Sequence, residues 1–190
     1  MKKIIFQYQI ILLPFFLFVS GCNDETKVDM GQGYYYIPFQ ESTFDMTMFG
    51  GNGIFTYKNN FTVPLIFPNI TSYKYDSRYI IVKQKFDFTE TKVLLKSLIF
   101  HPNLFEYDKD FVLIDEKYVM NVPHLNNSGL EDKYVDSIMH EDLHIKKMME
   151  HKENYYIIDK TKHAIMGPFT KLEFDKKKRN NASIDKLKLE

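Results

Sequence analysis

The chain has 190 residues, of which 44% are hydrophobic and 16% aromatic, and its 25 basic and 25 acidic side chains give a formal charge of zero. Because the chain has no excess of positive charge to attract the phosphate backbone, we expect no nucleic-acid partner. The sequence holds a single cysteine, so no disulfide can form within the chain. Length and apolar content are typical of one domain with an ordinary hydrophobic core.

The N-terminus has the layout of a bacterial lipoprotein signal peptide. Lys2 and Lys3 precede a largely apolar stretch that ends in the letters VSGC at Cys22. The apolar run covers about ten residues, roughly half of a membrane-spanning helix, which favours cleavage over retention. VSGC resembles the lipobox, in which the cysteine is diacylated and becomes the first mature residue, and two acyl chains give stable anchoring. We therefore predict a signal peptide over residues 1–21 and lipidation of Cys22, with the membrane as partner.

The residues after Cys22 suggest where the protein is sorted. Residues 22–32 have the composition of a flexible tether. Asp24 and Glu25 resemble the acidic surface-export signal of Bacteroides-type lipoproteins, although ordinary tether charges explain them equally well. We expect a lipid-anchored protein of the cell envelope, at the outer membrane and displayed on its surface.

Short alternating or aromatic runs beyond the tether predict strands. Single strands are expected at Gly33–Phe39, Ser42–Phe49 and Phe111–Ile114, and hairpins within Gly53–Pro68, Asn69–Phe86 and Asn154–Phe169. The second hairpin should turn at Asp76-Ser77-Arg78, where short polar side chains accept hydrogen bonds from the turn backbone.

Helical periodicity and capping residues predict a few helices between the strands. They cover Thr89–Leu98 with Thr89 as N-cap, Leu130–Met139, and Thr170–Arg179 with Thr170 as N-cap. Antiparallel hairpins interspersed with short helices indicate the α+β class, here a meander of hairpins in a single domain over residues 33–179. A disordered tail is expected over residues 180–190.

The stretch His140-Glu141-Asp142-Leu143-His144 matches the zinc-peptidase pattern H-E-x-x-H. In such enzymes the two histidines bind zinc, the glutamate polarises the metal-bound water, and a third protein ligand completes the site. The alternative function of the chain is therefore a zinc-dependent hydrolase with His140 and His144 as metal ligands and Glu141 as catalytic residue.

Helical geometry argues against this zinc site. A continuous helix turns by about 100° per residue, which puts His140 and His144 opposite an apolar arc. That arc consists of Val135, Ile138, Met139, Ile145 and Met149. Asp142 would lie within this arc, a costly place for an unpaired carboxylate. We predict instead that the helix ends near Met139 or His140 and that Glu141 or Asp142 lies near the N-cap of a second short helix, with no metal or other cofactor bound.

A resemblance to a family covers most of the chain from Gly33 to Arg179. The segments YIIVKQKFDFTETK (Tyr79–Lys92) and NYYIIDKTKHAIMGPF (Asn154–Phe169), with the following TKLEF and KKR, resemble small uncharacterised lipoproteins of Bacteroides-type bacteria, which form a domain family of unknown function. The resemblance implies an envelope lipoprotein and no known activity, cofactor or catalytic residue.

These observations favour an envelope lipoprotein that acts as a binding or accessory module for an unknown envelope protein or ligand, without enzymatic activity. Besides the zinc hydrolase, a third reading is an inhibitor or immunity-like lipoprotein that blocks a partner through an aromatic surface.

Overall fold

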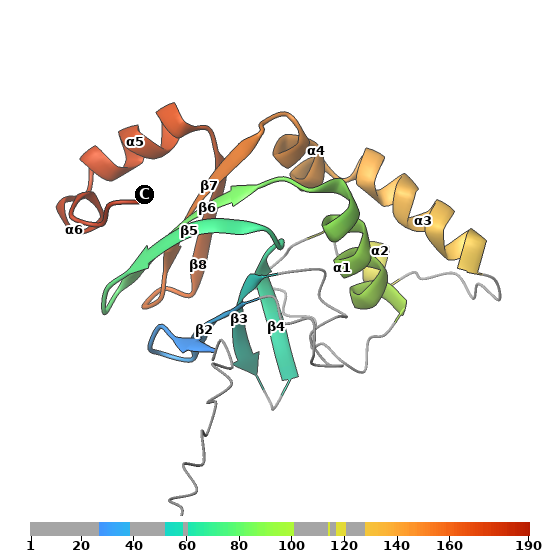
Figure 1. Cartoon of the computed structure of the whole chain (residues 1–190), viewed down its shortest axis with the longest axis horizontal. Helices are drawn as coiled ribbons and strands as arrows, with labels where there is room; N and C mark the ends of the chain where they lie inside the picture. The colour runs from blue at the N-terminus through green and yellow to red at the C-terminus, as the bar shows by residue number, and fades with distance from the viewer. Residues whose placement is uncertain (1–26, 39–51, 59–60, 101–113, 115–116, 121–127) are drawn as a thin grey trace, which may run out of the picture.

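The computed structural model describes residues 27–38, 52–58, 61–100, 114, 117–120 and 128–190. In this part of the chain the strands form two antiparallel sheets of four, with helices packed around them (Figure 1). The predicted α+β class, built of antiparallel hairpins and short helices in one domain, is confirmed. The predicted strand at Ser42–Phe49 lies outside the described residues.

The first sheet follows chain order and contains β1 (Val28–Asp29), β2 (Tyr34–Ile37), β3 (Gly53–Lys58) and β4 (Phe61–Ile66). The second sheet also follows chain order, with β5 (Ile70–Tyr75), β6 (Tyr79–Lys85), β7 (Glu153–Asp159) and β8 (Ala164–Phe169). The three predicted hairpins therefore form, as β3–β4, β5–β6 and β7–β8. Two of them meet in the second sheet because β6 pairs with β7 along its whole length.

The helices lie between β6 and β7 and after β8. They are α1 (Phe88–Phe100), α2 (Lys117–Met120), α3 (Ser128–Glu141), α4 (Leu143–Met149), α5 (Lys171–Arg179) and α6 (Ala182–Asp185). The three predicted helices are confirmed as α1, α3 and α5. The predicted N-cap of α1 is wrong: Asp87, not Thr89, accepts a hydrogen bond from the backbone of Glu90, because the helix already begins at Phe88. Thr170 caps α5 as predicted, in a reciprocal pair of hydrogen bonds with Glu173.

The second sheet separates two apolar cores, because successive side chains of its central strands, β6 and β7, point to opposite faces. On one face, Ile80 and Val82 of β6 and Tyr156 and Ile158 of β7 join a large core with the first sheet, α1, α3 and α4. On the other face, Tyr79 and Ile81 of β6 and Tyr155 and Ile157 of β7 pack against Phe174 and Ile184, which come from α5 and α6. In Figure 1, α5 and α6 accordingly lie on the side of the second sheet away from the first.

Both ends of the domain extend further than predicted. Val28 and Asp29 pair with β2, and Met30 is buried, so the predicted tether over residues 22–32 is too long: its last residues belong to the fold. The predicted disordered tail over residues 180–190 is also wrong, because α6 forms there and buries Ile184. In both places apolar side chains dock into a core built by distant segments: Met30 at the N-terminal end, and Ile184 with the partly buried Leu187 and Leu189 at the C-terminal end.

Candidate functional site

The predicted lipidation site, Cys22, lies outside the described residues. In the part that is described, no helix combines the length and the apolar content that crossing a membrane requires. Lipidation of Cys22 therefore stays a prediction.

The zinc-peptidase pattern is divided between two helices. His140 and Glu141 close α3, whereas His144 lies in the first turn of α4. Asp142 is the N-cap of α4, and its carboxylate accepts hydrogen bonds from the backbone of His144 and Ile145 at 2.9 and 3.0 Å. The predicted helix break and the N-cap at Asp142 are thus confirmed, and the cap explains why a carboxylate is buried here.

The two histidines of this pattern lie in different surroundings. His140 is exposed, as its predicted position opposite the apolar arc implies, whereas His144 is half-buried although the same geometry places it opposite the arc. Burial lowers the pKa of His144, and Lys147 lowers it further against the opposing effect of Asp142. The break also rotates the apolar arc, because Met148 is buried and Met149, which was predicted in the arc, is exposed.

Metal binding needs several ligands that converge on one point. Among the residues with described coordinates, no group of three His, Cys, Asp or Glu side chains is placed to hold a metal ion. The described neighbourhood of His140 and His144 therefore supplies no third acidic or histidine ligand.

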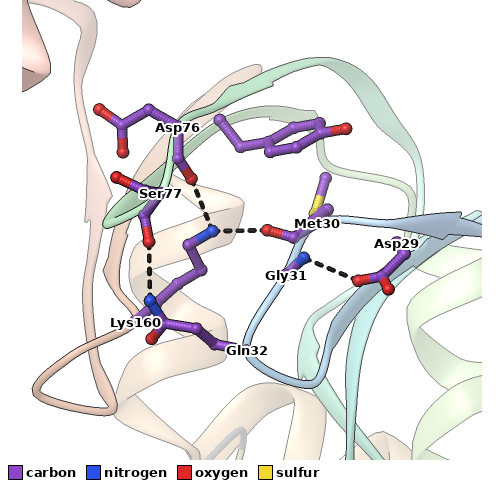
Figure 2. Close-up of a pocket in the computed structure, with 8 residues that line it drawn as sticks. Asp29, Met30, Gly31, Gln32, Asp76, Ser77 and Lys160 are labelled. Carbon is purple, nitrogen blue, oxygen red and sulfur yellow. Dashed lines mark hydrogen bonds between the residues drawn. The ribbon is translucent and has the colours of Figure 1, made fainter.

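A second candidate site lies where three turns meet, and we call it the turn junction. It joins the β1–β2 turn (Met30–Gly33), the β5–β6 turn (Asp76–Arg78) and the β7–β8 turn (Lys160–His163). A hollow of about 540 Å³ opens there, lined by Asp29, Gln32, Tyr75, Ser77 and Lys160 among others. Figure 2 shows the β1–β2 turn and the β5–β6 turn on either side of the Lys160 side chain.

Lys160 is the central group of the turn junction. It is 1% exposed, and its ammonium donates hydrogen bonds to the carbonyl of Asp76, at 2.6 Å, and to the carbonyl of Met30 (Figure 2). Burial lowers the pKa of Lys160, although the Asp76 and Asp29 carboxylates oppose that shift. A buried charge is tolerated only when hydrogen bonds compensate for lost water. Lys160 thereby links the two sheets through their turns.

The turn backbone itself is held by short polar side chains. Asp29 accepts a hydrogen bond from Gly31 at 2.7 Å, and Gln32 donates one to the carbonyl of Ser77 at 2.7 Å (Figure 2). Asp76 accepts hydrogen bonds from the backbone of Arg78 and Tyr79 at 2.7 and 2.6 Å. This confirms the predicted turn at Asp76-Ser77-Arg78.

An ion pair and a tyrosine–histidine contact complete the turn junction. The guanidinium of Arg78 lies 3.1 Å from the carboxylate of Asp159, and Asp159 is buried. Burial works against ionisation of Asp159, but hydrogen bonds from Thr161 and Arg78 hold its pKa below the usual range. The hydroxyl of Tyr34 is 3.1 Å from Nδ1 of His163. Burial, with a smaller effect of Asp159, raises the pKa of Tyr34 to about 12.

The turn junction was not predicted from the sequence. A lysine in a β7–β8 turn is usually exposed, and its burial depends on two turns that lie far away along the chain. One signal was available: the Gly31-Gln32-Gly33 stretch between Val28 and Tyr34 is a hairpin-turn pattern. Gly31 and Gly33 have φ angles of 80° and 78°, which glycine adopts without strain, and Gln32 between them also has a positive φ of 57°.

No protein-family model, no curated protein and no solved structure matches this chain. The resemblance to small Bacteroides-type lipoproteins therefore stays a prediction from the quoted segments.

Proposed function

We propose that the chain is a lipid-anchored protein of the cell envelope, whose domain acts as a binding or accessory module held close to the membrane through Cys22. The observation that supports this most is the short spacing between the predicted anchor and the fold. The only cysteine closes a lipobox-like VSGC, and β1 already begins at Val28. An extended residue spans at most about 3.6 Å, so the intervening segment reaches no further than about 20 Å.

With the anchor at Cys22, this short spacing would keep the start of the fold near the bilayer. Because β1 leads directly into the β1–β2 turn, we expect the turn junction on the anchored side of the domain. Its hollow of about 540 Å³ is within the size range of ligand sites in proteins. A ligand or envelope partner bound there would be held beside the membrane surface.

The anchoring is tested by Cys22→Ser in cells fed a labelled fatty acid, with Asn23→Ser as the matched control. The wild type and Asn23→Ser should carry the label and sediment with membranes. Cys22→Ser should lose the label, because the hydroxyl does not replace the thiol in the lipobox reaction, and should remain as an uncleaved or soluble form. Retained label and membrane association in Cys22→Ser would overturn the proposal.

Surface display is a separate part of the proposal, supported by Asp24 and Glu25, which follow the predicted anchor after Asn23. Protease added to intact cells should digest the domain, and replacing both acidic residues by Asn and Gln should protect it. Full protection of the wild type, while a known surface protein is digested, would place the domain in the periplasm instead.

A further inference from the structure

The outer face of the second sheet carries a basic hollow of about 360 Å³, which we call the lysine hollow. Its lining includes Lys83 of β6, Tyr155 of β7, Lys171, Phe174 and Lys178 of α5, and Lys188 near the C-terminus. The first sheet packs on the opposite face of the second sheet. The lysine hollow is therefore separated by the sheet from the anchored side of the domain.

Two buried aromatic rings lie at the floor of the lysine hollow: Tyr155 is 4% exposed and Phe174 is 1% exposed. The rings of Tyr155 and Phe174 are stacked, with centroids 5.1 Å apart and an interplanar angle of 30°. The Lys171 ammonium lies 5.7 Å from the Tyr155 ring centroid, and that of Lys178 lies 5.8 Å from the Phe174 centroid. Cations thus border an apolar lining to which the partly buried Leu189 also belongs, an arrangement that suits a ligand with both an apolar ring and a negative charge.

The cations of the lysine hollow differ in how far they are neutralised. Lys83 pairs with Glu153 at 2.9 Å, and Lys171 pairs with Asp175. Within the described part of the chain, neither Lys178 nor Lys188 has a carboxylate within ion-pair distance. The lysine hollow therefore holds two positive charges without an acidic partner there.

Lys178 also retains hydrogen-bonding capacity. Its ammonium donates to the carbonyl of Leu187, a neutral acceptor, and an ammonium has three donors. Glu190, the acidic residue that lines the hollow, is already paired with Lys74 at 3.4 Å. An incoming anion would therefore meet free donors on Lys178 and an ammonium on Lys188 that no described carboxylate neutralises.

We propose that the lysine hollow binds a phosphate monoester carried on an aromatic or sugar ring. A phosphate monoester has a charge of about −1.5 to −2 at neutral pH, which matches the two unneutralised lysines. The ring packs against the apolar lining, where Leu189 lies beside the edges of the buried Tyr155 and Phe174, and the volume is within the range of small-molecule sites. This site is independent of the anchor at Cys22 and of the turn junction.

Isothermal titration calorimetry on the purified full chain in a non-ionic detergent tests this proposal. Four probes test the ring, the phosphate charge and the lipid alternative separately. They are phenyl phosphate, inorganic phosphate without the ring, benzoate with a single charge, and dihexanoyl phosphatidic acid as a lipid phosphate monoester. Phenyl phosphate should bind about tenfold more tightly than inorganic phosphate, because only the former buries a ring against the apolar lining of the hollow. It should also bind more tightly than benzoate and the lipid.

The matched variants differ only in which lysines are neutralised. Lys178→Gln combined with Lys188→Gln should weaken phenyl phosphate binding about tenfold, since it removes both unneutralised charges. Lys176→Gln combined with Lys177→Gln removes two exposed charges of α5 that do not line the hollow, so it should change affinity by less than about twofold. Absence of phenyl phosphate binding, equal weakening by both pairs, or equal or tighter binding of benzoate or the lipid would overturn the proposal.

Discussion

Lysines have opposite roles in the turn junction and in the lysine hollow. In the turn junction, the Lys160 ammonium is buried and bonded to two backbone carbonyls from different turns. In the lysine hollow, Lys178 has one carbonyl partner and Lys188 is exposed. A cation whose donors are directed to backbone groups contributes to the fold, whereas one with free donors can bind a ligand. Hydrogen-bond satisfaction separates the two roles more clearly than residue type does.

The acidic residues beside these lysines also differ between the two regions: those in the turn junction are bonded to the backbone, and those beside the lysine hollow form surface ion pairs. Asp29 and Asp76 in the turn junction accept hydrogen bonds from the turn backbone, which fixes the loops around Lys160. Glu153 and Asp175 beside the lysine hollow form ion pairs with lysine side chains that are partly exposed. Exposed pairs contribute little to stability, so the lysine hollow can be altered without loss of the fold.

The largest expected effect is on stability when Lys160 is replaced by Met. The change leaves the carbonyls of Met30 and Asp76 without their donor, and each buried unsatisfied group costs about 1–3 kcal/mol. We expect a loss of about 2–4 kcal/mol in the free energy of unfolding, measured by urea denaturation. Lys162→Met, in the same turn but exposed, should change it by less than about 0.5 kcal/mol. A similar small effect for Lys160→Met would contradict a structural role.

The second prediction concerns alkaline pH. The pKa of Tyr34 is raised from 10.0 to about 12, so the unfolded chain loses this proton first as pH rises. Its contribution to stability is complete below pH 10 and is lost between pH 10 and about 12, by about 2–3 kcal/mol. Tyr34→Phe should remove this part of the alkaline loss. Urea unfolding across that pH range decides it, and identical pH profiles for wild type and variant would refute the assignment.

The third prediction compares a residue that is bonded into the fold with an exposed neighbour, both within the stretch that matches the zinc-peptidase pattern. Asp142 is committed to the fold as the N-cap of α4, so Asp142→Ala should lower the free energy of unfolding by about 1 kcal/mol. Glu141→Ala, at an exposed neighbouring position, should change it by less than about 0.5 kcal/mol. Thermal unfolding monitored by circular dichroism measures both. The reverse order of effects would argue for a role of Glu141 that the helix break does not explain.

The smallest expected effect belongs to the lysine hollow. Lys188→Met should alter the free energy of unfolding by less than about 0.5 kcal/mol, because Lys188 is exposed and has no ion pair in the described structure. Urea denaturation of this variant beside Lys160→Met gives the contrast directly. A loss above about 1 kcal/mol for Lys188→Met would show that this cation, too, is part of the fold.

The local patterns of the sequence predicted most of the described elements. Alternation gave the hairpins β3–β4, β5–β6 and β7–β8, and a capping residue gave the start of α5. The helix break at Asp142 was predicted because a buried carboxylate needs partners, which a helix N-terminus supplies. Each of these inferences uses residues that are close together in the chain.

The remainder could not be predicted because it depends on contacts between distant residues. Met30 and Ile184 are buried in cores that other segments form. Their local sequence does not show this burial, so the residues around them were predicted to be a tether and a disordered tail. Lys160 is buried where it donates hydrogen bonds to the carbonyls of Met30 and Asp76, which lie 130 and 84 positions away along the chain. The lysine hollow likewise combines β6, β7, α5 and the C-terminal residues, a combination that no local pattern indicates.

Amine labelling of the native chain tests the central distinction most directly. A brief pulse of an acylating reagent, followed by mass spectrometry of peptides, gives a relative rate for each lysine. We predict that Lys160 reacts at least about a hundredfold more slowly than Lys188, because it becomes accessible only when the turn junction opens. Labelling of Lys160 as fast as Lys188 would contradict the account, since its lowered pKa would then mark an accessible, reactive amine rather than a buried link between the sheets.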